Sequence, residues 1–190
     1  MATIDIDQFR QYEKQGLITC RNHPEFDLLI WNYTAKCQFE RVWDQVTMQA
    51  RGLITKSDGT IVGRGFKKFF NIEEHQGSIP LEAFKVTEKL DGSLGILFQV
   101  NGIAYIATRG SFTSEQAVKG TEILHRKYRD FPFQEQYTYL FEIVYPENSI
   151  VVDYGEREDL ILLAVIHTKT GTEDHIHQIN DWPFPVVKYY

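Results

Sequence analysis

The sequence is poor in cysteine and proline, and it contains no long apolar run. Cys20 and Cys37 are its two cysteines among 190 residues. Their spacing matches no paired metal-ligand motif, and a chain of this length does not need disulfides to fold, so we expect two reduced thiols. No apolar stretch approaches the ~18 residues that a membrane-spanning helix needs. We therefore expect no membrane contact.

Basic residues are missing where a secreted protein would need them. The first residues, MATIDIDQFRQYEK, carry acids in place of a basic and then apolar signal peptide, so we expect a cytoplasmic protein. Lysine and arginine number 20 against 26 aspartates and glutamates, which gives a net charge of −6. Nucleic-acid affinity comes mainly from basic groups that meet phosphates, so any such contact has to be local.

The chain does contain enough apolar surface for a folded domain. Hydrophobic residues make up 43% of the sequence, aromatic residues 14% and charged residues 24%, which is typical of a soluble folded protein. The length of 190 residues predicts a single domain. We assign residues 1–27 to an N-terminal helical arm and 28–190 to the core.

One segment of this acidic chain is basic. Residues 51–68 hold a single acid, Asp58, and five basic residues, namely Arg51, Lys56, Arg64, Lys67 and Lys68. A solvated hairpin face explains such a cluster, and so does a wall that binds phosphate. The composition alone leaves both interpretations open.

Strand patterns outnumber helix patterns. We predict strands over 28–33, 139–145 and 160–167, and hairpins around Ser57-Asp58-Gly59 and around Asn101-Gly102, the latter joining 94–100 to 103–108. Apolar residues at helical spacing predict a helix over 4–15. A capping box of Thr113 and Gln116 predicts a second helix that runs to about residue 128. The pattern indicates an α+β fold of antiparallel hairpins with helices at the side.

A lysine stands just before the Asn101-Gly102 hairpin, in the segment EKLDGSLGILFQV. Lys89 lies between Val86 and Leu94, a costly place for an unpaired charge. A lysine whose stem snorkels from a strand edge is one interpretation. The other is a nucleophile, because burial and neighbouring cations lower the pKa of an amine and free its lone pair. Gly92 permits a close backbone approach, and Asp91 offers a carboxylate two residues on.

These residues carry a resemblance to a known family. Lys89-Leu90-Asp91-Gly92-Ser93 matches the K-x-D-G-S motif of covalent nucleotidyltransferases, and it is most similar to the form found in phage-type, ATP-dependent RNA ligases that repair tRNA. RGLITKSDGTIVGRGFKKFFN, TRGSFTSEQA and LFEIVYPENSIVV resemble further segments of the same ligases. The resemblance extends from about residue 28 to the last residue.

The resemblance implies a role for each matching residue. Lys89 would be the nucleophile, and Asp91 would lie beside the reacting centre or near a metal-bound water. Arg51 and Lys68 would contact the triphosphate, and Phe70 would line the wall beside them or belong to the core. Glu142 would bind the ribose. Glu88 and Gly92 would contribute backbone to the nucleotide pocket.

The implied reaction has three steps and uses ATP with a divalent ion, most simply Mg²⁺. The lysine attacks the α-phosphate of ATP, the adenylate passes to an RNA 5′-phosphate, and a 3′-hydroxyl then displaces AMP. RNA ends, tRNA ends among them, are the implied partners. No group of residues is assigned as metal ligands.

The sequence departs from the family pattern near its end. Neither an E-G-x-V strand nor the following K-x-K pair occurs before Tyr190. We therefore interpret the chain as an adenylyltransferase domain truncated before those motifs, as half of a split ligase, or as an enzyme to which a partner subunit or second copy supplies cations. A non-catalytic subunit that binds nucleotides or RNA ends is the rival interpretation.

Overall fold

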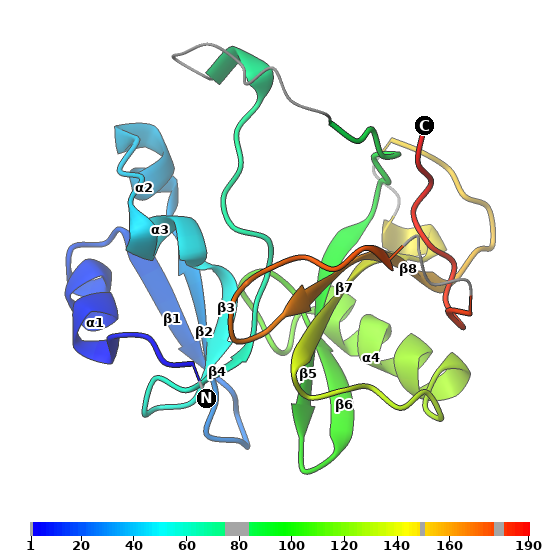
Figure 1. Ribbon diagram of the computed structural model, residues 1–190, viewed down its shortest axis with the longest axis horizontal. Helices are drawn as coiled ribbons and strands as arrows, with labels where there is room; N and C mark the ends of the chain where they lie inside the picture. The colour runs from blue at the N-terminus through cyan, green and yellow to red at the C-terminus, as the bar shows by residue number, and fades with distance from the viewer. Residues whose placement is uncertain (1, 75–83, 149–150, 177–180) are drawn as a thin grey trace.

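Two antiparallel sheets of four strands each form the framework that carries the candidate site (Figure 1). The computed structural model describes residues 2–74, 84–148, 151–176 and 181–190. The first sheet has the strand order β1-β2-β3-β4, and the second has the order β6-β5-β7-β8. This architecture confirms the predicted α+β class with antiparallel pairing.

The first sheet comes from the N-terminal third of the chain. Its strands are β1 (Ile18–Asn22), β2 (Leu29–Tyr33), β3 (Arg51–Thr55) and β4 (Ile61–Gly63). Helix α1 (Ile6–Lys14) covers one face, where Phe9 packs edge-on against Trp31 with 5.3 Å between the ring centroids. The helix predicted over 4–15 is therefore confirmed.

The predicted N-terminal arm is not purely helical. Residues 18–22 form β1, which pairs with β2 across the boundary that we drew between residues 27 and 28. Two short helices, α2 (Ala35–Glu40) and α3 (Gln45–Gln49), follow β2 and were not predicted either. At five to six residues they are too short to show a clear helical period, and their N-caps, Thr34 and Asp44, are the only local signal.

The second sheet contains the hairpin that follows Lys89. Its strands are β5 (Ser93–Val100), β6 (Ile103–Ala107), β7 (Tyr137–Val144) and β8 (Asp159–His167). Asn101 and Gly102 join β5 to β6 with φ values of 52° and 77°. Positive φ at both central residues is the requirement of the hairpin turn that Asn-Gly predicts, so this prediction is confirmed.

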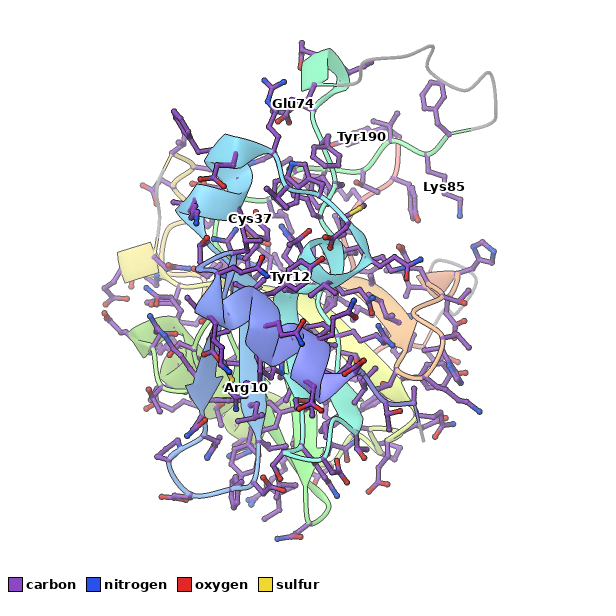
Figure 2. The ribbon with its side chains drawn as sticks, turned by 90° about the vertical axis from the view of Figure 1, so that its left-hand side faces the viewer. Arg10, Tyr12, Cys37, Glu74, Lys85 and Tyr190 are labelled. Atoms are coloured by element: carbon purple, nitrogen blue, oxygen red, sulfur yellow. The ribbon has the colours of Figure 1, made fainter. Side chains whose placement is uncertain are left out.

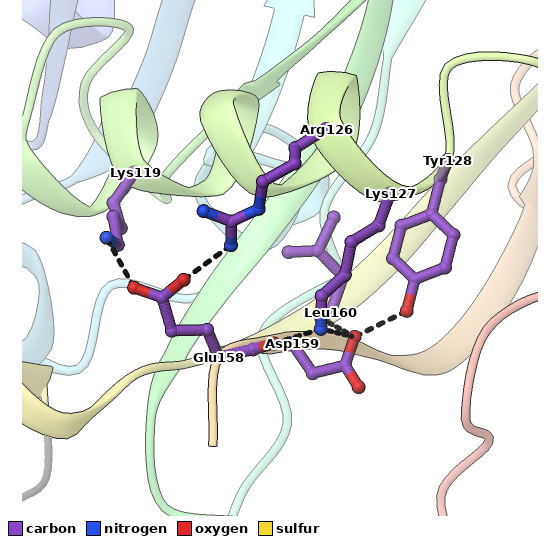
Figure 3. A network of polar contacts seen from close by, with 7 residues as sticks. All are labelled: Lys119, Arg126, Lys127, Tyr128, Glu158, Asp159 and Leu160. Carbon is purple, nitrogen blue, oxygen red and sulfur yellow. Dashed lines mark hydrogen bonds and ion pairs between the residues drawn. The ribbon is translucent and has the colours of Figure 1, made fainter. Parts of the chain in front are cut away.

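Helix α4 (Glu115–Lys127) covers the second sheet, and its start differs by one residue from the prediction. Ser114, not Thr113, is the N-cap, and its hydroxyl accepts a hydrogen bond from the N–H of Ala117 at 3.3 Å. Figure 3 shows how side chains along α4 meet the start of β8. Glu158 pairs with Lys119 at 2.6 Å and with Arg126, and Asp159 accepts from Tyr128.

Buried side chains of both sheets meet to form the core between them. They include Leu28, Ile30, Ile54, Ile96, Phe98, Leu140 and Ile166. The contact is close at Gly52, where an added Cβ would lie 2.2 Å from Cδ1 of Ile96. The side chain of Ile96 from β5 therefore packs directly on the backbone at the start of β3, near the predicted site residues of both strands.

The C-terminal segment runs beside the residues that lead into β5. The N–H of Glu88 donates to the carbonyl of Lys188 at 3.0 Å, and the N–H of Tyr190 donates to Val86 at 3.0 Å. Figure 2 shows Lys85 and Tyr190 at the same end of the molecule as Glu74, which belongs to the 3-10 turn Ile72–Glu74. The last residues of the chain thus hold the segment that contains Lys89.

Candidate functional site

Lys89 lies between two anchored neighbours and is itself exposed. Glu88 is tied to Lys188 through its backbone, and the side chain of Leu90 is buried in the core of the second sheet. We expected a desolvated lysine on this segment, and the structure corrects that expectation. Leu90 points into the core, and Lys89, the residue before it, points outward. Its charge nevertheless acts on the carboxylate of Glu142 and lowers the pKa of that group.

Glu142 comes from the middle of the second sheet. It lies on β7 directly opposite Leu94 of β5, two residues beyond Gly92. A Cβ at position 92 would lie 2.5 Å from the carbonyl oxygen of Ile143 and 3.3 Å from Oε1 of Glu142. Only glycine fits this approach, as the sequence indicated. The motif therefore places the backbone of Gly92 directly against Glu142, three residues after Lys89.

Burial dominates the electrostatics of Glu142. Desolvation raises the pKa of its carboxyl group from 4.5 to about 7, against the smaller opposite effects of the Gly92 backbone and the positive charge of Lys89. The charge of Asp91 raises the pKa further. The carboxyl group therefore changes its charge near neutral pH, which is a common property of functional sites.

Asp91 holds a loop in place. Its Oδ2 accepts hydrogen bonds from the N–H groups of Val151 and Val152 at 2.5 and 2.8 Å. The backbone N–H of Asp91 donates to the hydroxyl of Tyr154 at 2.9 Å. The carboxylate therefore acts on the backbone that follows β7, while its charge still reaches Glu142. The structure gives it a positioning contact that the sequence did not predict.

A β-bulge turns Arg51 toward the second sheet. Trp31 lies opposite Leu53, but the next pair is Asn32 with Arg51, so Gly52 is the extra residue. Gly52 has a φ of 79°, which suits glycine. Without the bulge, Arg51 would share the face of Leu53, which packs toward α1. Gly52 of the R-G pair thus determines which face of the sheet Arg51 occupies.

Arg51 is half-buried among aromatic and basic groups. Its guanidinium donates to the carbonyl of Phe66 at 3.4 Å and lies 4.9 Å from the ring centre of Phe69. Burial lowers the pKa of Arg51, and the positive charge of Arg109 lowers it further. Arg109 donates to the hydroxyl of Tyr33 at 3.3 Å. Two arginines therefore lie close together around one tyrosine.

Lys68 and Phe70 lie at the edge of this group. The ammonium of Lys68 is 4.2 Å from the ring centre of Phe70 and 5.4 Å from that of Trp43. Trp43 in turn packs edge-on against Tyr33 at 5.1 Å. A continuous series of ring and cation contacts thus connects Lys68 to the tyrosine that Arg109 contacts. Phe70 is half-buried and serves as a wall for this lysine.

The five basic residues of segment 51–68 do not form one wall. Arg64 points away from Arg51 and donates to the carbonyl of Thr168 at 2.6 Å, so it joins the two sheets. Lys56 lies beyond the far end of β3, where it lines a different cavity. Lys67 is exposed. Hairpin alternation and the Gly52 bulge separate these side chains, and Arg51 is the member that faces the space between the sheets.

That space is a cleft of about 460 Å³ between the two sheets, which we call the arginine cleft. Its lining includes Arg51, Arg109, Arg21, Asn32 and Ser93. The sequence motifs contain Arg109, in TRGSF, and Ser93, but gave neither a role. Arg21 carried no signal, because β1 was not predicted.

The described residues contain no preformed metal site and no membrane-spanning helix. No group of three or more histidine, cysteine, aspartate or glutamate side chains there is arranged to hold a metal ion. Within the same ranges, no helix has the length and hydrophobicity to cross a bilayer.

The fold and the site define a nucleotidyltransferase-like domain. A putative ATP-dependent DNA ligase from Aquifex aeolicus has a similar structure, with a TM-score of 0.58 over 97% of this chain and 50% of that protein, at 16% identity. This likeness shows the fold. In the sequence comparison, a family described as RNA ligase matches residues 49–188, and the chain belongs to that family.

Individual relatives agree with this assignment. The putative bifunctional polynucleotide kinase/RNA ligase of Autographa californica nuclear polyhedrosis virus is 30% identical over 90% of this chain. A putative RNA ligase of Thermovibrio ammonificans is 33% identical over 65% of the chain, and the RNA ligase of Rhodothermus phage RM378 is 26% identical over 80%. The chain spans 28%, 35% and 43% of the lengths of these three relatives.

Proposed function

We propose that the chain is the adenylyltransferase domain of an ATP-dependent RNA ligase and that Lys89 becomes covalently linked to AMP. One observation carries the proposal: the charge of Lys89, a motif lysine on an anchored segment, acts on the carboxyl group of Glu142, a half-buried residue of β7 against which the backbone of Gly92 lies. The family assignment supplies the reaction class. The described residues supply an amine, a carboxylate and a group of arginines in one region.

In the first step the amine of Lys89 attacks the α-phosphorus of ATP. A phosphorus–nitrogen bond forms, the bond to the β-phosphate oxygen breaks, and pyrophosphate leaves. The attack requires an uncharged amine, because only that form carries a free lone pair. Arg51 binds phosphate oxygens through its planar fork, while Lys68 acts as a point charge at the edge of the site.

The carboxylate of Glu142 accepts a hydrogen bond from a ribose hydroxyl and so places the nucleotide against Lys89. The backbone of Glu88 and Gly92 lines the nucleotide pocket, where the absence of a Cβ at position 92 leaves room. Phosphoryl transfer is catalysed mainly by placement and charge neutralisation, and these contacts supply the placement.

Mg²⁺ suits this site as an ion carried by the triphosphate. Magnesium is usually held by one or two carboxylates together with substrate phosphates, and the described residues offer isolated carboxylates and no group of three. Glu142 and Asp91 are the carboxylates near Lys89. The ion would neutralise charge on the transferred phosphoryl group.

The later steps concern RNA. The adenylate passes from Lys89 to the 5′-phosphate of an RNA end, and a 3′-hydroxyl displaces AMP to join the strands. tRNA ends in the cytoplasm are substrates of this type. A partner subunit or a second copy would supply further cations for these steps.

The test is covalent labelling with α-³²P-labelled ATP and Mg²⁺. We expect wild-type protein to carry covalent AMP that is visible on a gel, stable in base and released by acid, as a phosphorus–nitrogen bond should be, and we expect Lys89→Ala to carry none. Lys85→Ala is the matched control, because Lys85 is an exposed lysine of the same segment and should label normally. A folded wild-type protein that acquires no label would instead favour the rival, a subunit that binds nucleotides or RNA ends without chemistry.

A further inference from the structure

The arginine cleft contains more positive charge than the proposed function has assigned. Three of its ten lining residues, Arg21, Arg51 and Arg109, are arginines, and none is an acid. Arg51 belongs to a recognised motif, whereas Arg21 lies on β1, before the residues 49–188 that match the RNA ligase family. The cleft therefore has one cationic wall that the family resemblance does not explain.

We propose that Arg21 is a phosphate ligand in the arginine cleft, where it binds a terminal phosphate together with Arg51 and Arg109. This inference rests on the proposed function for the source of that phosphate. Two sources have the same chemistry, namely the triphosphate of ATP and the 5′-phosphate of an RNA end.

Register in the first sheet directs polar side chains toward the cleft. Thr19 of β1 lies opposite Asn32 of β2, and Asn32 lies opposite Arg51 of β3. All three line the cleft, as does Arg21, two residues along β1 from Thr19. Residues two apart on a strand share a face, so β1 presents Thr19 and Arg21 on the same side. Three adjacent strands thus contribute to one polar surface.

The positive charges of this surface are not paired with acids in the part of the chain that the structure describes. Among the described residues, no ion pair joins Arg21, Arg51 or Arg109 to a carboxylate. Arg51 and Arg109 are close enough for the charge of Arg109 to lower the pKa of Arg51. Cations held together without an acid are stabilised by an anion, and the planar guanidinium fits phosphate oxygens in a bidentate manner.

A buried amide supports the presence of a ligand. Oδ1 of Asn32 is buried and has no hydrogen-bond partner among the described residues. A buried polar atom of this kind is costly unless something binds to it. Because the amide can present either its oxygen or its NH₂ group, Asn32 is able to accept from a sugar hydroxyl or to donate to a phosphate.

The lining also indicates which part of a nucleotide the cleft holds. None of its ten lining residues is aromatic. Bases bind most often by stacking on rings, whereas phosphates and sugars need only polar contacts. Arg21 and Thr19 are exposed, so the β1 side of the cleft opens to solvent. The cleft is therefore suited to a phosphate whose attached group extends outward.

The experiment measures binding directly and needs no catalytic step. Wild-type protein and Arg21→Gln are titrated with inorganic tripolyphosphate by calorimetry. They are also titrated with a short 5′-phosphorylated RNA and with its 5′-hydroxyl counterpart by fluorescence anisotropy. Each titration is repeated at several salt concentrations. Arg129→Gln is the matched control, since Arg129 is an exposed arginine at a different cavity.

We expect Arg21→Gln to weaken binding of at least one phosphate ligand by about tenfold. The slope of log affinity against log salt concentration should become shallower by about one. Loss for tripolyphosphate alone identifies ATP as the source, loss for the 5′-phosphorylated RNA alone identifies the RNA end, and loss for both shows a shared site. Asn32→Asp, which places an acid in the cleft, should weaken binding of the same ligand. Arg129→Gln should bind like wild type.

Unchanged affinity for both ligands in Arg21→Gln, or a wild-type protein that binds neither, would overturn the inference. These outcomes are independent of the labelling of Lys89. A protein that fails to label but loses phosphate binding in Arg21→Gln would refute the proposed catalytic function and retain the phosphate site. Thermal unfolding of each variant shows whether it is folded.

Discussion

The backbone of Gly92 runs so close to Glu142 that a Cβ at position 92 would lie 3.1 Å from Cγ of that glutamate. Desolvation is the largest cause of the raised pKa of this carboxyl group, and the backbone of Gly92 opposes it with a hydrogen bond that favours the charged form. Gly92 therefore affects both the space around Glu142 and its charge. The ionisation of this group should be measurable in the stability of the protein.

Glu142 should make the domain less stable as the pH rises toward 7. Its pKa is 4.5 in the unfolded chain and about 7 in the folded protein, so between these values the folded state holds a proton that the unfolded state has lost. The stability contribution is complete below the unfolded pKa and is lost as the pH rises through the folded pKa. The slope reaches at most about 1.4 kcal/mol per pH unit.

Urea unfolding of wild type and Glu142→Gln between pH 4.5 and 8 checks this expectation. Glutamine resembles the protonated acid, so the variant should lose less stability over this range. Subtracting the unfolding free energy of the variant from that of wild type at each pH cancels the contributions of the other titrating groups. Glu147→Gln is the control, because Glu147 is an exposed glutamate in the turn after β7. Equal pH slopes in wild type and Glu142→Gln would contradict the raised pKa.

Arg64 should contribute to stability and not to ATP binding. Its Nε donates to the carbonyl of Thr168 at 2.6 Å, and its backbone N–H donates to the hydroxyl of Thr138 at 3.1 Å. Arg64→Met keeps much of the apolar stem and removes the guanidinium contacts between the two sheets. We expect the free energy of unfolding to fall by about 1–3 kcal/mol.

The comparison is with Lys67→Met, which changes an exposed cation of the same segment. Denaturant unfolding should separate the two variants, while labelling by ATP at a temperature where both are folded should be similar. A basic wall that binds phosphate would give the reverse result: Arg64→Met would keep its stability and lose labelling.

The sequence predicted the second sheet better than the first. Asn101-Gly102, the strand pattern of β7 and the strand pattern of β8 are local signals, and each element formed where they indicated. β1 is different, because its burial alternates only from Ile18 to Arg21, which is too short a signal to predict a strand by itself. Its existence depends on pairing with β2, a tertiary contact that no short window contains.

The site shows the same division. Gly92 could be predicted because close approach is a property of glycine, and Lys89 because the motif surrounds it. The direction of Arg51 depends on a bulge at Gly52, and the group around Arg21 and Arg109 depends on two sheets that meet. Charge counts alone placed all five basic residues of segment 51–68 together, since composition does not specify which face a side chain occupies.

Asp91 should act on Lys89 by positioning. Its carboxylate accepts hydrogen bonds from the N–H groups of Val151 and Val152. These bonds hold the segment that leads into β5 against the loop after β7. Asp91→Asn keeps the shape and removes the charge that makes both bonds strong. We expect the free energy of unfolding to fall by about 1–3 kcal/mol, with slower formation of the AMP adduct.

Hydrogen exchange at single amides distinguishes positioning from direct chemistry. In Asp91→Asn the amides of Val151 and Val152 should exchange faster, in proportion to the loss of labelling. Asp153→Asn is the matched control, since Asp153 accepts from the N–H of Gly155 at 2.7 Å within an exposed turn. If Asp91→Asn abolished labelling while both valine amides kept their protection, the carboxylate would act at the reacting centre, and its contact with the loop would be incidental.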